Sequence, residues 1–176
     1  MLIFQGISEV PRGFGPAAVT IGKFDGVHAG HHAVIDALEA AAVEQGLVST
    51  VVTFDRNPLR LLDPERCPDA LASNAKKLEL LEAAGVGATV MLTFDRTFSR
   101  QAPEDFVTGV LVNALHARVV FVGADFRFGV RGSGNVALLA ELGSNHGFEV
   151  RQIPELTTGE RRASSTWIRE LLDEGD

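Results

Sequence analysis

The sequence predicts an α/β fold built on a Rossmann-like, doubly wound parallel sheet of about five strands. Apolar, β-branched segments alternate with segments that have helical spacing of apolar residues along most of the chain. Strands of that kind are typical of parallel sheets covered by helices on both faces. A glycine-rich turn directly follows the first of these strands and opens a helix. If the strand order is 3-2-1-4-5, strands 1 and 4 are neighbours, and the ligand site is expected at their carboxyl ends.

The elements follow from local signals taken in order. Met1–Phe4 is a short extended segment suited to a sheet edge, and the five main strands are expected at 18–21, 48–54, 88–94, 118–122 and 148–153. Helices are expected from the glycine-rich turn to Gly46, over 74–84 behind the N-cap Ser73, from Pro103 to near His116, over 136–146 and over 166–172. The long segment 55–68 is expected to be a functional loop.

Composition limits the class of protein. The chain has 176 residues, of which 45% are hydrophobic, so we expect one domain spanning 1–176. The net charge of −7 disfavours a nucleic-acid groove, which needs a clustered basic surface. The single cysteine, Cys67, excludes an internal disulfide framework and fits a reducing compartment. We find no membrane-length apolar run and no signal peptide, so we expect a cytoplasmic protein; its oligomeric state is not predicted.

The stretch from Thr20 to His31 carries the most specific chemical signal. It contains Gly22, Gly26 and Gly30, which allow the backbone to turn sharply and approach a ligand closely. His31 falls in the first turn of the helix that follows, where free N–H groups and the helix dipole favour an anion. This arrangement predicts a phosphate-binding turn.

Two other interpretations of this stretch compete with phosphate binding. One is a simple loop with two exposed histidines. The other is a metal site formed by Asp25, His28 and His31, although no cysteine or additional ligand cluster lies nearby in the sequence to complete a closed zinc site. We favour phosphate binding because the glycines and the helix start coincide.

A second candidate cluster lies near the C-terminal end, where Ser164, Ser165 and Thr166 begin a helix and Arg169 follows one turn later. Hydroxyl groups and a planar guanidinium can hold phosphate oxygens together. An ordinary helix cap with a solvated arginine explains the same residues. A triphosphate needs several such groups, so a cluster of this kind is expected to accompany the histidine turn.

Two further stretches follow predicted strands. In the segment Gly123–Gly129, Asp125 suits a polar ligand contact, while Phe126 and Phe128 could flank a flat aromatic ligand or belong to the core, which we favour slightly for Phe126. Arg131, further along this loop, is expected to be solvated. In Thr53–Pro58, Asn57 and Pro58 could shape the wall of a pocket or form a plain turn.

Together these stretches resemble the FMN adenylyltransferase module of bacterial bifunctional FAD synthetases, which belong to the nucleotidyltransferase superfamily. The resemblance covers essentially the whole chain and depends on three motifs: G-x-F-D-G-x-H-x-G-H, S-S-T-x-I-R and G-x-D-F-x-F-G. It implies a nucleotidyltransferase fold that carries the HxGH motif. It also implies transfer of AMP from ATP to FMN, which gives FAD and pyrophosphate, with Mg²⁺ held mainly by the ATP phosphates.

The resemblance also implies roles for individual residues. His28, His31 and Arg169 would be catalytic. The flavin would contact Asn57, Pro58, Asp125, Phe126 and Phe128. The residues implied at ATP are Gly22, Phe24, Asp25, Gly26, His28, His31, Gly123, Ser164, Ser165, Thr166 and Arg169.

The chain departs from the family pattern at two places. Arg56-Asn57-Pro58 stands where Pro-His-Pro is frequent, and Lys23 stands where Asn or a small apolar residue is common. The riboflavin kinase domain that usually follows is expected to be absent. Two alternatives stay open: another nucleotidyltransferase with the same histidine turn, or a flavin- or nucleotide-binding module without catalysis.

Overall fold

The computed structural model describes residues 1–155, 157–158 and 161–175. Its centre is a six-stranded, all-parallel sheet with the order β1-β4-β3-β2-β5-β6. The strands are β1 (Leu2–Phe4), β2 (Ala17–Ile21), β3 (Val48–Phe54), β4 (Ala88–Leu92), β5 (Ala117–Gly123) and β6 (Glu149–Ile153). The five main strands therefore have the order 3-2-1-4-5 on which the expected ligand site depends. The predicted count was one too low, because the expected edge segment β1 joins the sheet beside β4.

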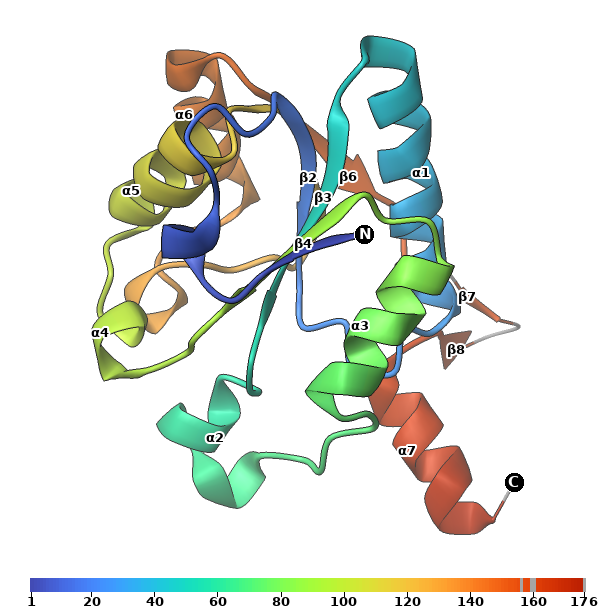
Figure 1. Cartoon of the computed structure of the whole chain (residues 1–176). Helices are drawn as coiled ribbons and strands as arrows, with labels where there is room; N and C mark the ends of the chain where they lie inside the picture. The colour runs from blue at the N-terminus through green and yellow to red at the C-terminus, as the bar shows by residue number, and fades with distance from the viewer. Residues whose placement is uncertain (156, 159–160, 176) are drawn as a thin grey trace.

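Helices cover both faces of this sheet, as predicted (Figure 1). On one face lie α1 (Ala29–Gln45) and α3 (Asn74–Ala83). On the other lie α6 (Val136–His146) and α5 (Pro103–Phe106), which continues into the π-helical segment η3 (Val107–Ala114). The central strands are buried on both sides: Val51 packs in the α1 layer and its neighbour Val52 in the opposite layer. This double burial explains why the strand sequences are continuously apolar.

The predicted helix ends are confirmed by their caps. Gly46 ends α1 in the left-handed conformation, with φ of 66°. The Ser73 hydroxyl accepts a hydrogen bond from the Lys76 N–H at the start of α3, and the Ser164 hydroxyl accepts one from the Trp167 N–H at the start of α7 (Ser165–Glu174).

The structure adds several short elements that the sequence pattern did not predict. The expected loop 55–68 contains two helical turns, and a small antiparallel strand pair precedes α7. These elements are α2 (Leu59–Leu62), η2 (Pro64–Arg66), β7 (Thr157–Thr158) and β8 (Arg161–Arg162), together with η1 (Ile7–Glu9), α4 (Arg96–Ser99) and η4 (Val130–Gly132). Segments this short have too few residues to show a hydrophobic period.

Close packing of α6 on the start of β6 makes a stability prediction. A Cβ at Gly143 would lie 2.6 Å from the Phe148 carbonyl oxygen, so Gly143→Ala requires the backbone to shift. We expect a loss of about 1–3 kcal/mol in the free energy of unfolding, measured by urea denaturation. Gly109→Ala is the matched control, because a Cβ there meets nothing within 4 Å. A loss at Gly109 equal to that at Gly143 would contradict the packing explanation.

Candidate active site

The turn between β2 and α1, residues 22–28, has an unusual backbone conformation. This segment, together with His31 at the start of α1, is called the histidine turn below. Phe24 and Val27 have positive φ values of 50° and 41°, and Gly26 lies between them at 78°. The left-handed region is unfavourable for a side chain such as valine. Both non-glycine side chains are buried, at 2% and 5% exposed, and this packing offsets the strain. The turn is thus held in one shape before any ligand arrives.

The two predicted histidines stack on each other at the start of α1. Their ring centroids are 3.8 Å apart, and the Phe24 ring lies 4.8 Å from that of His31. The His28 backbone N–H donates to Nδ1 of His31 at 3.3 Å. This bond indicates that Nδ1 of His31 is the acceptor, so a neutral ring carries its proton on Nε2 and can donate it to a ligand.

Burial lowers the pKa of both imidazoles, which favours their neutral forms. It lowers the pKa of His31 to about 3, with smaller contributions from the charges of His28, His32 and Lys77. Burial and then the Arg162 charge lower the pKa of His28, with Asp25 opposing them. Nδ1 of His28 is buried and has no partner at full hydrogen-bond geometry among the described residues. The side chains and backbones of His28 and His31 face each other in the reciprocal arrangement of a capping box, so the protein itself encloses this nitrogen.

The low pKa of His31 makes a prediction about stability. Below about pH 6.5 the unfolded chain binds a proton at His31 that the folded chain does not bind, so the free energy of unfolding should fall as the pH decreases toward 3. The slope from one such group approaches 1.4 kcal/mol per pH unit at most, or about 1 kcal/mol in practice. His31→Gln should flatten it in urea denaturation between pH 5 and 7. Equal slopes for wild type and variant would contradict a neutral, partly buried ring.

The predicted cluster at the C-terminal end lies against the histidine turn. The Ser165 hydroxyl donates to the Asp25 carbonyl oxygen at 2.9 Å, across 140 residues of sequence. A Cβ at Gly30 would come within 3.2 Å of the Ala163 carbonyl oxygen, so this close approach favours glycine. The segment around Ser164 and the histidine turn are therefore on the same side of the molecule, as predicted.

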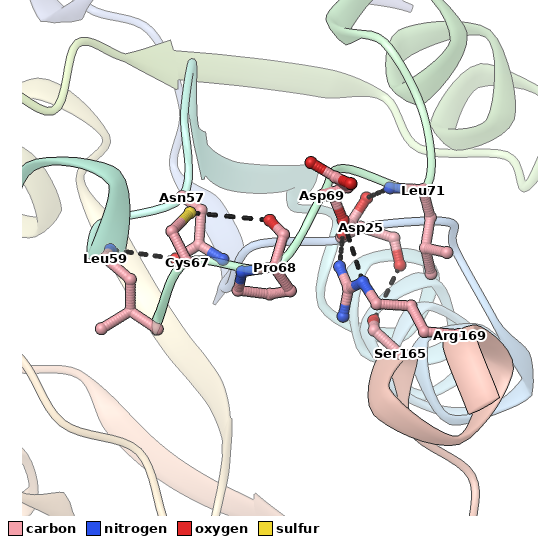
Figure 2. A network of polar contacts seen from close by, with 9 residues as sticks. All are labelled: Asp25, Asn57, Leu59, Cys67, Pro68, Asp69, Leu71, Ser165 and Arg169. Carbon is pink, nitrogen blue, oxygen red and sulfur yellow. Dashed lines mark hydrogen bonds and ion pairs between the residues drawn. The ribbon is translucent and has the colours of Figure 1, made fainter. Parts of the chain in front are cut away.

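Asp25 and Arg169 link these two segments in a way that the sequence did not indicate. The Asp25 carboxylate pairs with the Arg169 guanidinium and also accepts from the Leu71 N–H at 2.9 Å (Figure 2). Nε of Arg169 donates to the Asp69 carbonyl oxygen at 2.9 Å. Figure 2 shows that α7 is thereby connected both to the histidine turn and to the loop before α3. In this structure the Arg169 guanidinium binds Asp25 and the Asp69 carbonyl oxygen, and its expected contact with phosphate stays a prediction.

A cavity of about 310 Å³, the histidine cavity, lies between the histidine turn, the end of β5 and the start of α7. Of the residues implied at ATP, those that line it are Gly22, Phe24, His28, His31, Gly123, Ser164 and Ser165. The four remaining residues implied at ATP do not line this cavity: Asp25, Gly26, Thr166 and Arg169.

A second cavity of about 460 Å³, the aromatic cavity, adjoins the first. Its walls include six of the 11 phenylalanines of the chain: Phe54, Phe94, Phe98, Phe106, Phe126 and Phe128. Phe126 and Phe128 stack with centroids 5.5 Å apart, and both line the cavity although Phe128 is also buried in the core. The exposed side chain of Arg131 borders the cavity, where solvation alone was expected. An apolar, ring-lined space of this size suits a flat aromatic ligand.

The two cavities share Ile21, Gly22, Asp125 and Phe126. A ligand in one can therefore reach a ligand in the other at the carboxyl ends of β2 and β5, which is the predicted switch point. Asp125 is held there by the Arg162 guanidinium at 3.3 Å. Arg162 also pairs with Glu155 at 2.9 Å, and sequence reasoning gave it no role although only Ala163 separates it from the Ser-Ser-Thr motif.

Pro58 lines the aromatic cavity, but Asn57 does not. Asn57 borders a small cavity of about 60 Å³, and its carboxamide oxygen accepts from the Leu59 N–H at 3.1 Å, which starts the short helix α2. Lys23 borders both of these spaces. Arg56 pairs with Asp55, whose pKa is lowered by this contact and by the Phe94 N–H against the opposing effect of burial.

Comparison with known proteins decides the family. Residues 12–167 match the sequence profile of the family described as FAD synthetase. The chain belongs to the FAD synthetase family. Within the described residues, no cluster of three His, Cys, Asp or Glu side chains could hold a metal. No described helix is long and apolar enough to cross a membrane.

The curated relatives of this FAD synthetase family member are named bifunctional riboflavin kinase/FMN adenylyltransferase. The protein from Haemophilus influenzae is 35% identical over 176 residues, covering 100% of this chain and 57% of its own length. The protein from Escherichia coli K12 is 33% identical over 173 residues, covering 98% of this chain and 55% of its own length. The chain thus spans about half the length of the curated relatives it matches.

Solved structures support the fold. A protein from Streptococcus pneumoniae, titled as a macrolide-efflux protein, has a TM-score of 0.80 at 23% identity, covering 97% of this chain and 56% of the other. Pantoate-beta-alanine ligase from Francisella tularensis has a TM-score of 0.65 at 14% identity, covering 97% and 73%. At these identities the likeness concerns the fold alone.

Proposed function

We propose that this chain transfers AMP from ATP to FMN, giving FAD and pyrophosphate. The observation that carries the proposal is the pair of adjoining cavities. One is lined by histidines, serines and Arg162, and the other by phenylalanines, and they meet at Gly22 and Asp125. This arrangement suits a triphosphate on one side and an isoalloxazine ring on the other. Membership in the FAD synthetase family and the names of the relatives agree with it.

The proposed chemistry needs no nucleophile from the protein. A phosphate oxygen of FMN attacks the α-phosphorus of ATP, a new phosphorus–oxygen bond forms, and the bond to the β-phosphate oxygen breaks as pyrophosphate leaves. The protein must align the two reactants and stabilise the charge that develops on the α-phosphate oxygens. The two cavities meet at the carboxyl ends of β2 and β5, and this shared region aligns FMN with ATP.

His28 and His31 are proposed to stabilise the α-phosphate. Nε2 of His31 carries the proton and donates it as a hydrogen bond, while Nδ1 is held by the His28 backbone. The His28 ring lines the same cavity and stacks on the His31 ring. A nearby anion favours the protonated form of an imidazole, so bound phosphates would raise the pKa values of both rings.

Mg²⁺ is proposed to enter with ATP, because this ion usually binds substrate phosphates together with only one or two carboxylates. Asp125 is the carboxylate that borders both cavities and could reach such an ion. When bound, Mg²⁺ would offset the repulsion between the two anionic substrates.

The test is incubation of the purified protein with FMN, ATP and Mg²⁺, followed by chromatography for FAD and an assay for pyrophosphate. Formation of both products in equal amounts is the expected result. Flavin binding without pyrophosphate release would instead indicate a non-catalytic module. Transfer of a nucleotide to pantetheine phosphate or nicotinamide mononucleotide in preference to FMN would indicate another nucleotidyltransferase.

A further inference from the structure

Lys77 is a buried cation that none of the sequence motifs included. Its side chain lies in α3 and the residue is only 7% exposed, whereas the adjacent Lys76 has a side chain that is 58% exposed and paired with Glu79. Lysine is rarely buried unless an anion pairs with it. Among the described residues, no carboxylate lies within ion-pair distance of the Lys77 ammonium. Asp25 and Asp55 act on it at longer range, opposing the burial that lowers its pKa.

Among the described residues, the hydrogen bonds of this ammonium go to the carboxyl end of β3. Nζ donates to the Phe54 carbonyl oxygen at 3.0 Å and lies 3.5 Å from the Thr53 hydroxyl oxygen. The Thr53 hydroxyl in turn donates to the Lys23 carbonyl oxygen at 3.0 Å. These bonds form a path from α3, through the end of β3, to the first residues of the histidine turn.

This path begins where the sheet ladder between β2 and β3 ends. The backbone bond from Gly22 N–H to the Val52 carbonyl oxygen, at 3.0 Å, is followed by the Thr53 side-chain bond to Lys23. The Lys77 ammonium therefore secures the continuation of both strands at the point where they border the cavities. Phe54 and Lys23 both line the aromatic cavity, and Gly22 lines both cavities.

We propose that Lys77 is a positioning residue for adenylyl transfer, holding the turn at Gly22–Lys23 and the wall at Phe54 in the register that the two reactants need. The inference rests on the proposed function. Small displacements of a bound reactant are costly, since about 1 Å can change the rate by about 100-fold. The positive charge of Lys77 also helps to lower the pKa of His31, so it acts on the neighbouring imidazole as well.

The test compares Lys77→Met, which keeps the length of the side chain and removes the ammonium, with Lys76→Met as the matched control. For Lys77→Met we expect kcat to fall at least about tenfold. The dissociation constants of FMN and ATP should change less than about threefold, and the variant should unfold within a few degrees of wild type, because replacing a buried charge by an apolar group is often neutral. Lys76→Met should match wild type in all of these measurements.

Two further measurements separate positioning from a purely structural role. The imidazole pKa of His31, followed by NMR, should rise in Lys77→Met because a nearby positive charge is lost. Lys77→Arg should recover most of kcat, since the small cavity beside Lys77, about 60 Å³, has room for the larger cation. The inference is overturned if Lys77→Met retains wild-type kcat, if its activity falls only in proportion to loss of folded protein, or if Lys77→Arg is as slow as Lys77→Met.

Failure of the proposed function would be visible separately. If the wild-type protein forms no FAD, the adenylyltransferase assignment is wrong. The effect of the Lys77 charge on the His31 imidazole is then still tested by the His31 pKa. An unchanged His31 pKa in Lys77→Met would overturn this effect as well.

Discussion

Replacement of His31 by alanine is expected to lower kcat for FAD formation by about 100- to 1000-fold, while the dissociation constant of FMN changes less than about threefold. The neutral ring lines the histidine cavity, and its Nδ1 is held by the His28 N–H, so that Nε2–H is free to donate to a phosphate. A donor aimed at charge that develops only in the transition state contributes to kcat and little to ground-state binding. Single-turnover kinetics and flavin fluorescence titration measure the two effects.

His32→Ala is the matched control for that experiment. This neighbouring histidine is exposed and does not line the histidine cavity, so its removal should change kcat less than about threefold. If His31→Ala weakens FMN binding as much as it lowers kcat, the ring contacts the flavin and the assignment to ATP is wrong.

Arg169→Ala is expected to lower kcat/KM for ATP by about 100-fold and to reduce the free energy of unfolding by about 1.5–3 kcal/mol. The guanidinium connects α7 to the Asp25 carboxylate and to the Asp69 carbonyl oxygen (Figure 2). Both partners of the ion pair are mostly buried, with side chains 21% and 17% exposed. Its removal leaves a carboxylate unpaired within the histidine turn and frees the helix that carries Ser164 and Ser165. Steady-state kinetics and urea denaturation provide the measurements.

Arg66→Ala provides the comparison for Arg169. Arg66 also pairs with an aspartate, Asp63, but its side chain is 83% exposed and the closest approach is 3.9 Å. Exposed pairs of this kind contribute little, so stability should change by less than about 1 kcal/mol and kcat/KM should not change. Wild-type kinetics in Arg169→Ala would show that Arg169 has a structural role only and takes no part in the reaction.

The ion pair between Asp25 and Arg169 also shows why site prediction from sequence was only partly sufficient. The motifs predicted that both residues would serve the nucleotide, and in the structure they contact each other from positions 144 residues apart. Whether they also contact ATP remains a prediction. Similarly, Asn57 was expected beside the flavin ring, whereas its side chain accepts from the Leu59 N–H beside the small cavity; of Asn57 and Pro58, Pro58 is the one that borders the aromatic cavity. Local spacing in the sequence indicates which residue types are present, but not which distant residues contact them in the folded protein.

The aromatic wall illustrates the same limit. Phe126 and Phe128 were candidates because they alternate just after a strand, and they line the cavity. Phe94, Phe98 and Phe106 come from three other segments, and no local pattern separates them from ordinary core residues. The one compositional signal was that nearly all aromatic residues of the chain are phenylalanine, with one tryptophan and no tyrosine.

Local sequence was enough to determine the alternation of strands and helices, the caps of the main helices and the position of the histidine turn. These features depend on residues within a few positions of one another: runs of buried β-branched side chains, glycines that permit positive φ, and polar caps. Tertiary structure alone decided that the histidine and aromatic cavities share a wall, that Arg169 pairs with Asp25, and that Lys77 is buried beneath the turn. Those contacts join segments far apart in the chain, and their energies depend on burial and distance, which only the folded arrangement sets.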